Sequence, residues 1–257
     1  MPFELEAFEQ INGFFWVFIR VSVFVFLMPL FGARGLPGIW KAGLSFVLAL
    51  VMLPVVPAPK ALPLTAPEFI LAVAAEVLLG LTAVFGVLAL FASVQLAGQI
   101  MSFQMGFSMA RAIDPSTGVQ STALSQFLYL FLVLLFFATD GHHILVRGIA
   151  ASFHLVPPGG MTFHPGLTEA LARISAEMFL AALKIAAPIM VALFLSNLCL
   201  GIVARTVPQV NILMIGFPIN IGIGMFLFGL LLRNLAPFLS GLTREMGTAM
   251  MQLLRMM

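Results

Sequence analysis

Charged side chains are scarce in this sequence. Asp, Glu, Lys and Arg make up 9% of the 257 residues, whereas 61% of the residues are hydrophobic. An average soluble domain is about a quarter charged, and so few charges cannot cover the water-exposed surface of a chain of this size. The composition therefore excludes an ordinary soluble domain. It predicts a protein that is integral to a membrane or buried in an assembly. The net charge of +2 is too small to indicate nucleic acid binding.

Cysteine is almost absent, and the N-terminal segment lacks basic residues. The single Cys199 excludes an intrachain disulfide framework, and its apolar neighbours in FLSNLCLGI predict a packing role. The first ten residues, MPFELEAFEQ, carry three glutamates where a secretory signal would carry lysine or arginine. We therefore expect no cleavable signal peptide, and we expect insertion through the internal apolar segments.

Motifs that carry chemistry are also missing. The sequence contains neither G-x-S-x-G nor G-x-x-x-x-G-K-[ST], which argues against a hydrolase of that type and against ATP binding. His142 and His143 are adjacent, so on a helix they should point to different faces, and no glutamate or third histidine lies at ligand spacing. We therefore predict no enzyme, no metal site and no cofactor.

Six long apolar segments dominate the sequence, and no alternating strand pattern competes with them. A membrane-spanning helix needs about 20 apolar residues, so the pattern predicts an all-α, membrane-type protein forming one domain over residues 1–257. The segments are Ile11–Phe31, Ala42–Val56, Phe69–Ala97, Ala123–Thr139, Ala176–Val203 and Asn211–Leu232. Residues 140–175 form the longest polar connection between them.

Basic residues do not mark one side of a six-span arrangement. A simple series of spans should show a Lys and Arg bias on one side, yet two similar sets alternate along the chain. One set is Arg34, Lys41, Arg111 and Arg205, and the other is Lys60, Arg147, Arg173, Arg244 and Arg255. We therefore expect kinked helical hairpins packed in a multi-subunit assembly rather than simple alternating spans.

The third segment carries a stripe of small residues at nearly helical spacing. Such stripes let helix backbones approach closely, and the partner is either another helix of this chain or a neighbouring subunit. The stripe comprises Ala72, Ala75, Gly80, Ala83, Gly86, Ser93 and Ala97, with Glu76 on nearly the same face.

Three ionisable residues interrupt apolar segments, namely Arg20, Glu76 and Lys184. Each costs about 2.5–3.5 kcal/mol at the centre of a membrane helix on insertion scales. Salt bridges, within or between chains, are one interpretation. An ion or proton path and a headgroup-level placement are the others.

The stretch GQIMSFQMGFSMARAIDPSTGVQST, from Gly98 to Thr122, is unusually apolar for a connection. Met101, Met105 and Met109 would share one helical face, and Gly106 weakens a regular helix. Asp114-Pro115 is typical of a helix start. The pattern predicts a bent connection over 106–113, either packed against its own helices or forming a deformable constriction in a pore.

The C-terminal tail, residues 240–257, is predicted to be an amphipathic helix. Its apolar stripe comprises Leu242, Met246, Met250, Leu253 and Met257. We expect this stripe to bind a partner groove or a membrane surface.

Four motifs resemble those of the FliR family, the flagellar export-gate subunits, which are related to a virulence type III secretion subunit. They are MPLFGARGLPGIWKAGLSFVLAL, GQIMSFQMGFSMARAIDPSTG, DGHHILV and PQVNILMIGFPINIGIG, and their order and spacing also match. The chain departs from the family at Asp140, where asparagine is more frequent.

The resemblance implies a structural and gating subunit of the flagellar type III export channel, present as one copy in a ring-like assembly with FliP and FliQ. FlhB associates with the cytoplasmic side, and unfolded flagellar proteins pass through the centre. It implies a location in the bacterial inner membrane, within the flagellar basal body. Residues matching the channel plug are Gly106, Phe107, Ser108, Met109, Ala110 and Arg111, and Met101, Phe103 and Met105 neighbour a methionine gasket. Independently of the resemblance, the alternative in which the small-residue stripe meets a neighbouring subunit would place Ala72, Glu76, Gly80, Ala83 and Gly86 at that interface.

The alternative interpretation is a stand-alone permease for ions or small molecules. A permease would place broken helices or paired ionisable residues in two matching halves, and no internal repeat is evident in the sequence.

Overall fold

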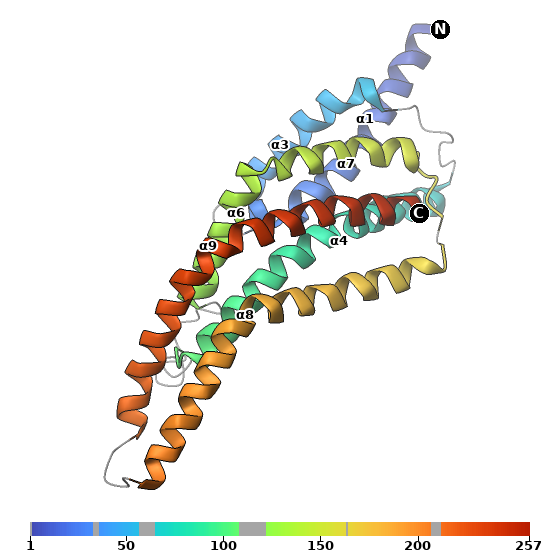
Figure 1. Cartoon of the computed structure of the whole chain (residues 1–257). Coiled ribbons are helices and arrows are strands. Elements are labelled where there is room, and N and C mark those ends of the chain that lie inside the picture. The colour runs from blue at the N-terminus through green and yellow to red at the C-terminus, as the bar shows by residue number, and fades with distance from the viewer. Residues whose placement is uncertain (1, 33–35, 57–64, 108–121, 163, 207–211) are drawn as a thin grey trace. The chain divides into compact units, whose positions relative to one another are not determined.

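In the part of the chain that the computed structural model describes, all regular secondary structure is helical (Figure 1), which confirms the predicted all-α class. The structure describes all residues except 1, 33–35, 57–64, 108–121, 163 and 207–211. The helices are α1 (Pro2–Leu27), α2 (Pro29–Gly32), α3 (Gly38–Met52), the short 3-10 helix η1 (Leu53–Val55), α4 (Ala66–Gln104), α6 (Ala123–Ala138), α7 (Gly141–Leu155), α8 (Gly166–Thr206) and α9 (Ile212–Arg255).

The chain folds into two compact units, each built from interleaved segments. Unit 1 comprises Met1–Ala89, Asp140–Ser175 and Thr243–Met257, and unit 2 comprises Leu90–Thr139 and Ala176–Leu242. Helices α4, α8 and α9 each contribute one part to each unit. No single cut in the sequence separates the units.

In unit 1, α1 supplies one wall of the core. Trp16, Val17 and Val21 are fully or almost fully buried, and Phe14 packs edge-on against Phe46 of α3. The outer face of α3 remains apolar and exposed, as Trp40 is 68% exposed. A large exposed apolar surface is typical of a membrane or subunit contact.

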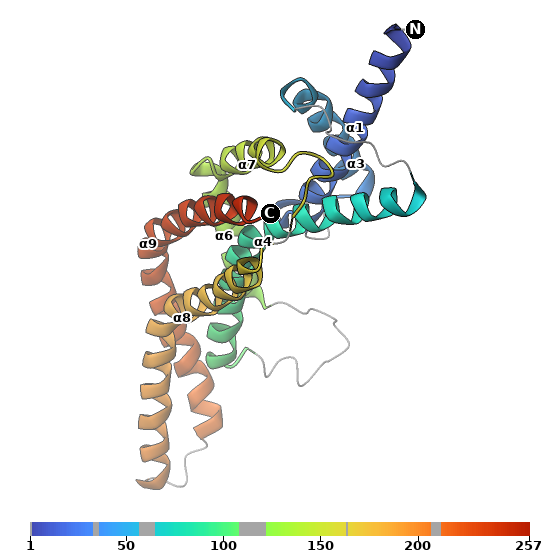
Figure 2. The same cartoon turned by 90° about the vertical axis from the view of Figure 1, so that its right-hand side faces the viewer.

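In unit 2, α4 and α6 pack closely. A Cβ atom on Gly98 would lie 2.5 Å from the Cα atom of Ser125, so only glycine allows this approach. Phe91 lies edge-on to both Tyr129 and Phe136. The second half of α8 and the first half of α9 run side by side as a hairpin (Figures 1 and 2), with Asn220 bonded to both Ser196 and Asn197.

One expectation about helix boundaries was wrong. Residues 140–175, predicted to be a polar connection, contain α7 and the first ten residues of α8. The helices were missed because residues 140–175 are more polar than the apolar segments on either side, and helices need not be apolar throughout. Cys199, for which a packing role was predicted, is exposed on α8.

Within the described residues, four helical stretches are long and apolar enough to cross a membrane, and a fifth is possible if α6 and α7 form one broken span. The four are Gly38–Val55, Ala66–Gln104, Gly166–Thr206 and Met214–Arg255. At 1.5 Å per residue, α4, α8 and α9 would measure about 60 Å each, whereas a bilayer core is about 30 Å thick. Helices of this length favour a hairpin assembly over a simple bundle of spans.

Candidate functional site

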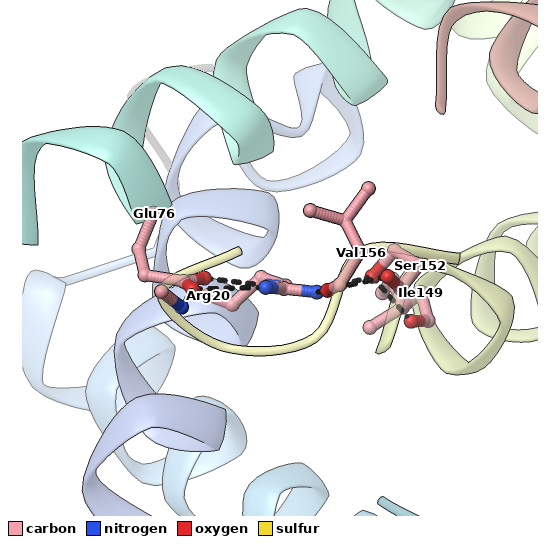
Figure 3. A network of polar contacts seen from close by, with 6 residues as sticks. Arg20, Glu76, Ile149, Ser152 and Val156 are labelled. Atoms are coloured by element: carbon pink, nitrogen blue, oxygen red, sulfur yellow. Dashed lines mark hydrogen bonds and ion pairs between the residues drawn. The ribbon is translucent and has the colours of Figure 1, made fainter. Parts of the chain in front are cut away.

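A buried ion pair joins α1 and α4 in unit 1 (Figure 3). Arg20 Nε donates to Glu76 Oε2 at 2.6 Å, and Arg20 Nη2 donates to Glu76 Oε1 at 2.9 Å. The side chains are 0% and 3% exposed. The fork of the guanidinium therefore binds the carboxylate with two parallel hydrogen bonds, which is the strongest geometry for this pair.

The same guanidinium also binds the C-terminal end of α7. Arg20 Nη1 donates to the carbonyl of Ser152 at 3.0 Å and to that of Val156 at 2.8 Å (Figure 3). The Arg20 Cζ atom lies 4.3 Å from the centre of the Phe153 ring. A cation is stabilised at this negative end of the helix dipole and over an aromatic face.

The carboxylate of Glu76 is satisfied from a second direction. The backbone N–H of Gly159 donates to Glu76 Oε1 at 3.3 Å, and Gly159 has φ +75°, which places it in the left-handed region that favours glycine. Arg20 and Glu76 thus join α1, α4, the end of α7 and the loop that follows it. Sequence reasoning missed Ser152 and Val156 because they contribute backbone carbonyls, which leave no signal in the residue types.

Of the interpretations open for the ionisable residues, the salt bridge within the chain is confirmed for Arg20 and Glu76. Hydrogen bonds on all sides of a neutral pair are typical of a structural network. Lys184 instead lies exposed on α8.

The C-terminal end of α4, in unit 2, has the hydrogen bonds of a Schellman motif. Phe107 N–H donates to the Ser102 carbonyl, and Gly106 N–H donates to the Phe103 carbonyl, both at 3.0 Å. Gly106 has φ +89°, as the left-handed residue of this motif requires. This helix stop agrees with the bend predicted to begin at Gly106, whereas residues 108–113 of the predicted connection lie outside the described residues.

Met101 and Met105, expected beside a pore gasket, lie in the core of unit 2 with no exposed surface. Met105 packs over Gly224 of α9, where an added Cβ would lie 2.6 Å from two of its atoms. The side chains that face outward are Phe103 and Phe107, which are 70% and 38% exposed. Up to Phe107, where the described part of this stretch ends, the methionines are thus buried and the phenylalanines exposed.

The remaining residues assigned to the plug, Ser108, Met109, Ala110 and Arg111, lie outside the described residues, as does the helix start expected near Pro115. The described part of α6 begins at Ala123. Its N-cap is Thr122, whose side chain accepts from Ser125 N–H and shares a 2.7 Å hydrogen bond with Ser102 of α4.

The small-residue stripe of α4 packs within the chain where it is buried. A Cβ atom on Gly80 would lie 2.6 Å from Val23 Cγ1 of α1, and Gly86 faces Met246 and Ala249 of α9. Glu76 and Ala83 are also buried. These contacts support packing of the stripe against other helices of the same chain. Ala72 is partly exposed, and its contact with a neighbouring subunit remains a prediction.

The apolar stripe of the tail is also internal, contrary to the expected partner or membrane contact. Met246, Met250, Leu253 and Met257 are each at most 6% exposed, and Met250 packs directly over Gly148 of α7. The tail is the end of α9, and it completes the core of unit 1. An amphipathic pattern alone does not distinguish packing within the chain from binding to a partner or a membrane, because an apolar face fits any apolar surface.

Asp140, His142 and His143 come together at the start of α7, contrary to the spacing argument made from the sequence. One ligand atom from each residue lies within 4.8 Å of the others. The two imidazole rings are 4.1 Å apart between centres. The argument considered only positions on a helix, whereas Asp140 precedes the helix with φ 58°.

Comparison with known proteins identifies the family. The family model described as "Bacterial export proteins, family 1" matches residues 11–246. The chain is 37% identical to "Flagellar biosynthetic protein FliR" of Bacillus subtilis over 84% of both chains. The chain belongs to the FliR family of bacterial export proteins.

Other FliR relatives match at similar length. The protein of that name from Escherichia coli is 31% identical over 91% of this chain and 90% of its own. The one from Caulobacter vibrioides is 32% identical over 90% and 92%. These matches confirm the resemblance read from the four motifs, and they support a component of flagellar protein export with apolar, transmembrane-type helices.

Proposed function

We propose that this FliR-family chain is a non-enzymatic structural and gating subunit of the flagellar type III export channel. One copy assembles with FliP and FliQ around a conduit for unfolded flagellar proteins, with FlhB on the cytoplasmic side. The complex belongs to the inner membrane and the flagellar basal body. The observation that carries the proposal is the family match over residues 11–246, which covers at least part of every described helix, from within α1 to within α9.

The surfaces of the chain support a hetero-oligomer. On α8, Phe194 and Leu195 are more than half exposed, and on α9 Met214 and Phe226 are about 70% or more exposed. Because these helices are about twice as long as the bilayer core is thick, lipid cannot cover such faces along their whole length. Neighbouring subunits therefore provide the natural cover.

Gating is assigned to the connection that follows the α4 helix stop. Gly106 directs the chain out of the helix, and Phe107 is the first exposed side chain beyond it. In the proposal, residues 106–111 close the conduit through non-directional contacts of Phe and Met side chains. Such contacts are individually small, so the seal can repack without leaving polar groups unsatisfied.

The assembly is tested by co-expressing the chain with FliP and FliQ and purifying it in mild detergent. The export proposal requires a complex that contains all three proteins. A monomer or small homo-oligomer that leaves FliP and FliQ behind would favour the permease alternative. Transport of a small solute by the purified chain in vesicles would support that alternative directly.

The gating is tested with a variant that lacks Ser108–Ala110 but keeps the Gly106 helix stop. We expect cells with this variant to take up small dyes or ions across the inner membrane while the complex still forms. Phe103→Ala is the matched control, because it removes an exposed phenylalanine from the last turn of α4 without shortening the connection. A deletion variant with an intact complex and a membrane as tight as wild type would contradict the plug.

A further inference from the structure

The start of α7 brings together three side chains of the types that bind transition metals. Asp140 Oδ1 and His143 Nδ1 are 3.1 Å apart, and His142 offers a third ligand atom within 4.8 Å of both. In a tetrahedral zinc site with bonds of about 2.0–2.1 Å, two ligand atoms lie roughly 3.3 Å apart. The Asp140–His143 pair already has nearly that separation, and a metal site would require the His142 ligand atom, now within 4.8 Å of both, to move closer.

The backbone directs the carboxylate toward the histidines rather than toward the helix. Asp140 is the N-cap of α7, yet its side chain caps no backbone N–H. It has φ 58° and is the only non-glycine residue with a positive φ among the described residues. Aspartate tolerates this left-handed conformation better than most residues, but at a cost. The strained turn places the carboxylate beside His143, three residues further on.

The cluster is also accessible and has suitable charge. The side chains of His143 and Asp140 are 59% and 74% exposed, so an ion can enter from solvent. A bare helix N-terminus disfavours cations, and the negative charge of Asp140 offsets that effect. Two imidazoles and one carboxylate suit zinc and neighbouring first-row divalent metals rather than Ca²⁺ or Mg²⁺.

We propose that Asp140, His142 and His143 form a binding site for a divalent transition-metal ion such as Zn²⁺. Three protein ligands leave at least one coordination position for water or for a donor group of another molecule. The site lies on unit 1 at the start of α7 and is independent of the Arg20–Glu76 pair and of the plug proposal.

The test uses the untagged full-length chain in detergent, titrated with Zn²⁺ by calorimetry and with Co²⁺ by visible absorption. The wild type should bind one ion, and Co²⁺ should develop the absorption of a four- or five-coordinate complex. Asp140→Asn and His143→Gln should each weaken binding by roughly tenfold or more, because the loss even of an outer partner costs ten- to a hundredfold.

Two variants make the result specific. Asn tolerates the left-handed turn, so Asp140→Asn removes the charge while the backbone keeps its conformation. His154→Gln is the matched control, because His154 is an exposed histidine in the last turn of the same helix, and its binding should equal wild type. Absence of one-to-one binding in the wild type would overturn the site. Wild-type affinity in both Asp140→Asn and His143→Gln would do the same.

Discussion

Arg20 and Glu76 are 56 residues apart in the sequence, yet two hydrogen bonds of 2.6 and 2.9 Å join their side chains in the core of unit 1. Neither charge is tolerable there alone. Each neutralises the other, and the carbonyls of Ser152 and Val156 accept from Arg20 Nη1. The pair therefore fixes the position of the end of α7 relative to α1 and α4.

Glu76→Gln should destabilise the chain by about 3–5 kcal/mol, because it leaves the Arg20 charge buried without a counterion. The measurement is the thermal melting temperature of the purified complex, with its yield. Lys184→Met, which removes an exposed charge from α8, should leave both unchanged. If Glu76→Gln melts like wild type but abolishes export, the carboxylate has a role in ion or proton coupling rather than a structural one.

Gly80→Ala and Gly86→Ala should differ in their effect on the melting temperature, although both glycines lie on α4. A Cβ on Gly80 would lie 2.6 Å from Val23 Cγ1, whereas on Gly86 the nearest atom would be 3.8 Å away. Overpacking at Gly80 should destabilise the chain by about 1–3 kcal/mol. The higher helix propensity of alanine should offset about 1 kcal/mol of this loss. Gly86→Ala should be neutral or stabilising. Val23→Ala combined with Gly80→Ala should restore melting, and equal melting of the two single variants would contradict the packing.

Met250→Glu should prevent stable folding of unit 1 even when no partner is present, because it buries an unpaired charge against Gly148 of α7. The measurement is protease resistance of the chain expressed alone in detergent. Thr248→Glu places the same charge on the exposed face of the same helix and should remain resistant. Normal resistance of Met250→Glu would show that the tail is not part of the core.

Gly106→Ala should destabilise the end of α4 by about 1 kcal/mol or more, because alanine disfavours a positive φ. The added Cβ would also lie 2.7 Å from the Phe217 ring. Gly222→Ala is the control on α9, where no atom lies within 4 Å of the added carbon. Hydrogen exchange of the Gly106 and Phe107 amides reports the helix stop directly, and unchanged protection in Gly106→Ala would contradict it.

Several features of this protein followed from the sequence alone. Low charge and six apolar segments determined the all-α, membrane-type class, since only helices satisfy their own backbone in an apolar environment. Glycine at position 106 indicated the bend, because its local conformational freedom requires no tertiary partner. The motif order identified the family.

Only the tertiary structure decided which surfaces meet. The helical period of a sequence shows that one face is apolar, but it does not show what covers that face. The tail stripe and Gly80 therefore fitted contacts with other molecules. In the structure, Met250 of the tail packs on Gly148, and Gly80 packs on Val23, both within the chain. The sequence shows that Arg20 and Glu76 are each energetically unfavourable within an apolar segment. It does not show how they are paired, because the two residues are 56 positions apart and the other acceptors are backbone carbonyls. Asp140 lies beside His142 and His143 because its φ angle is positive. Residue spacing on a helix does not predict such a backbone conformation.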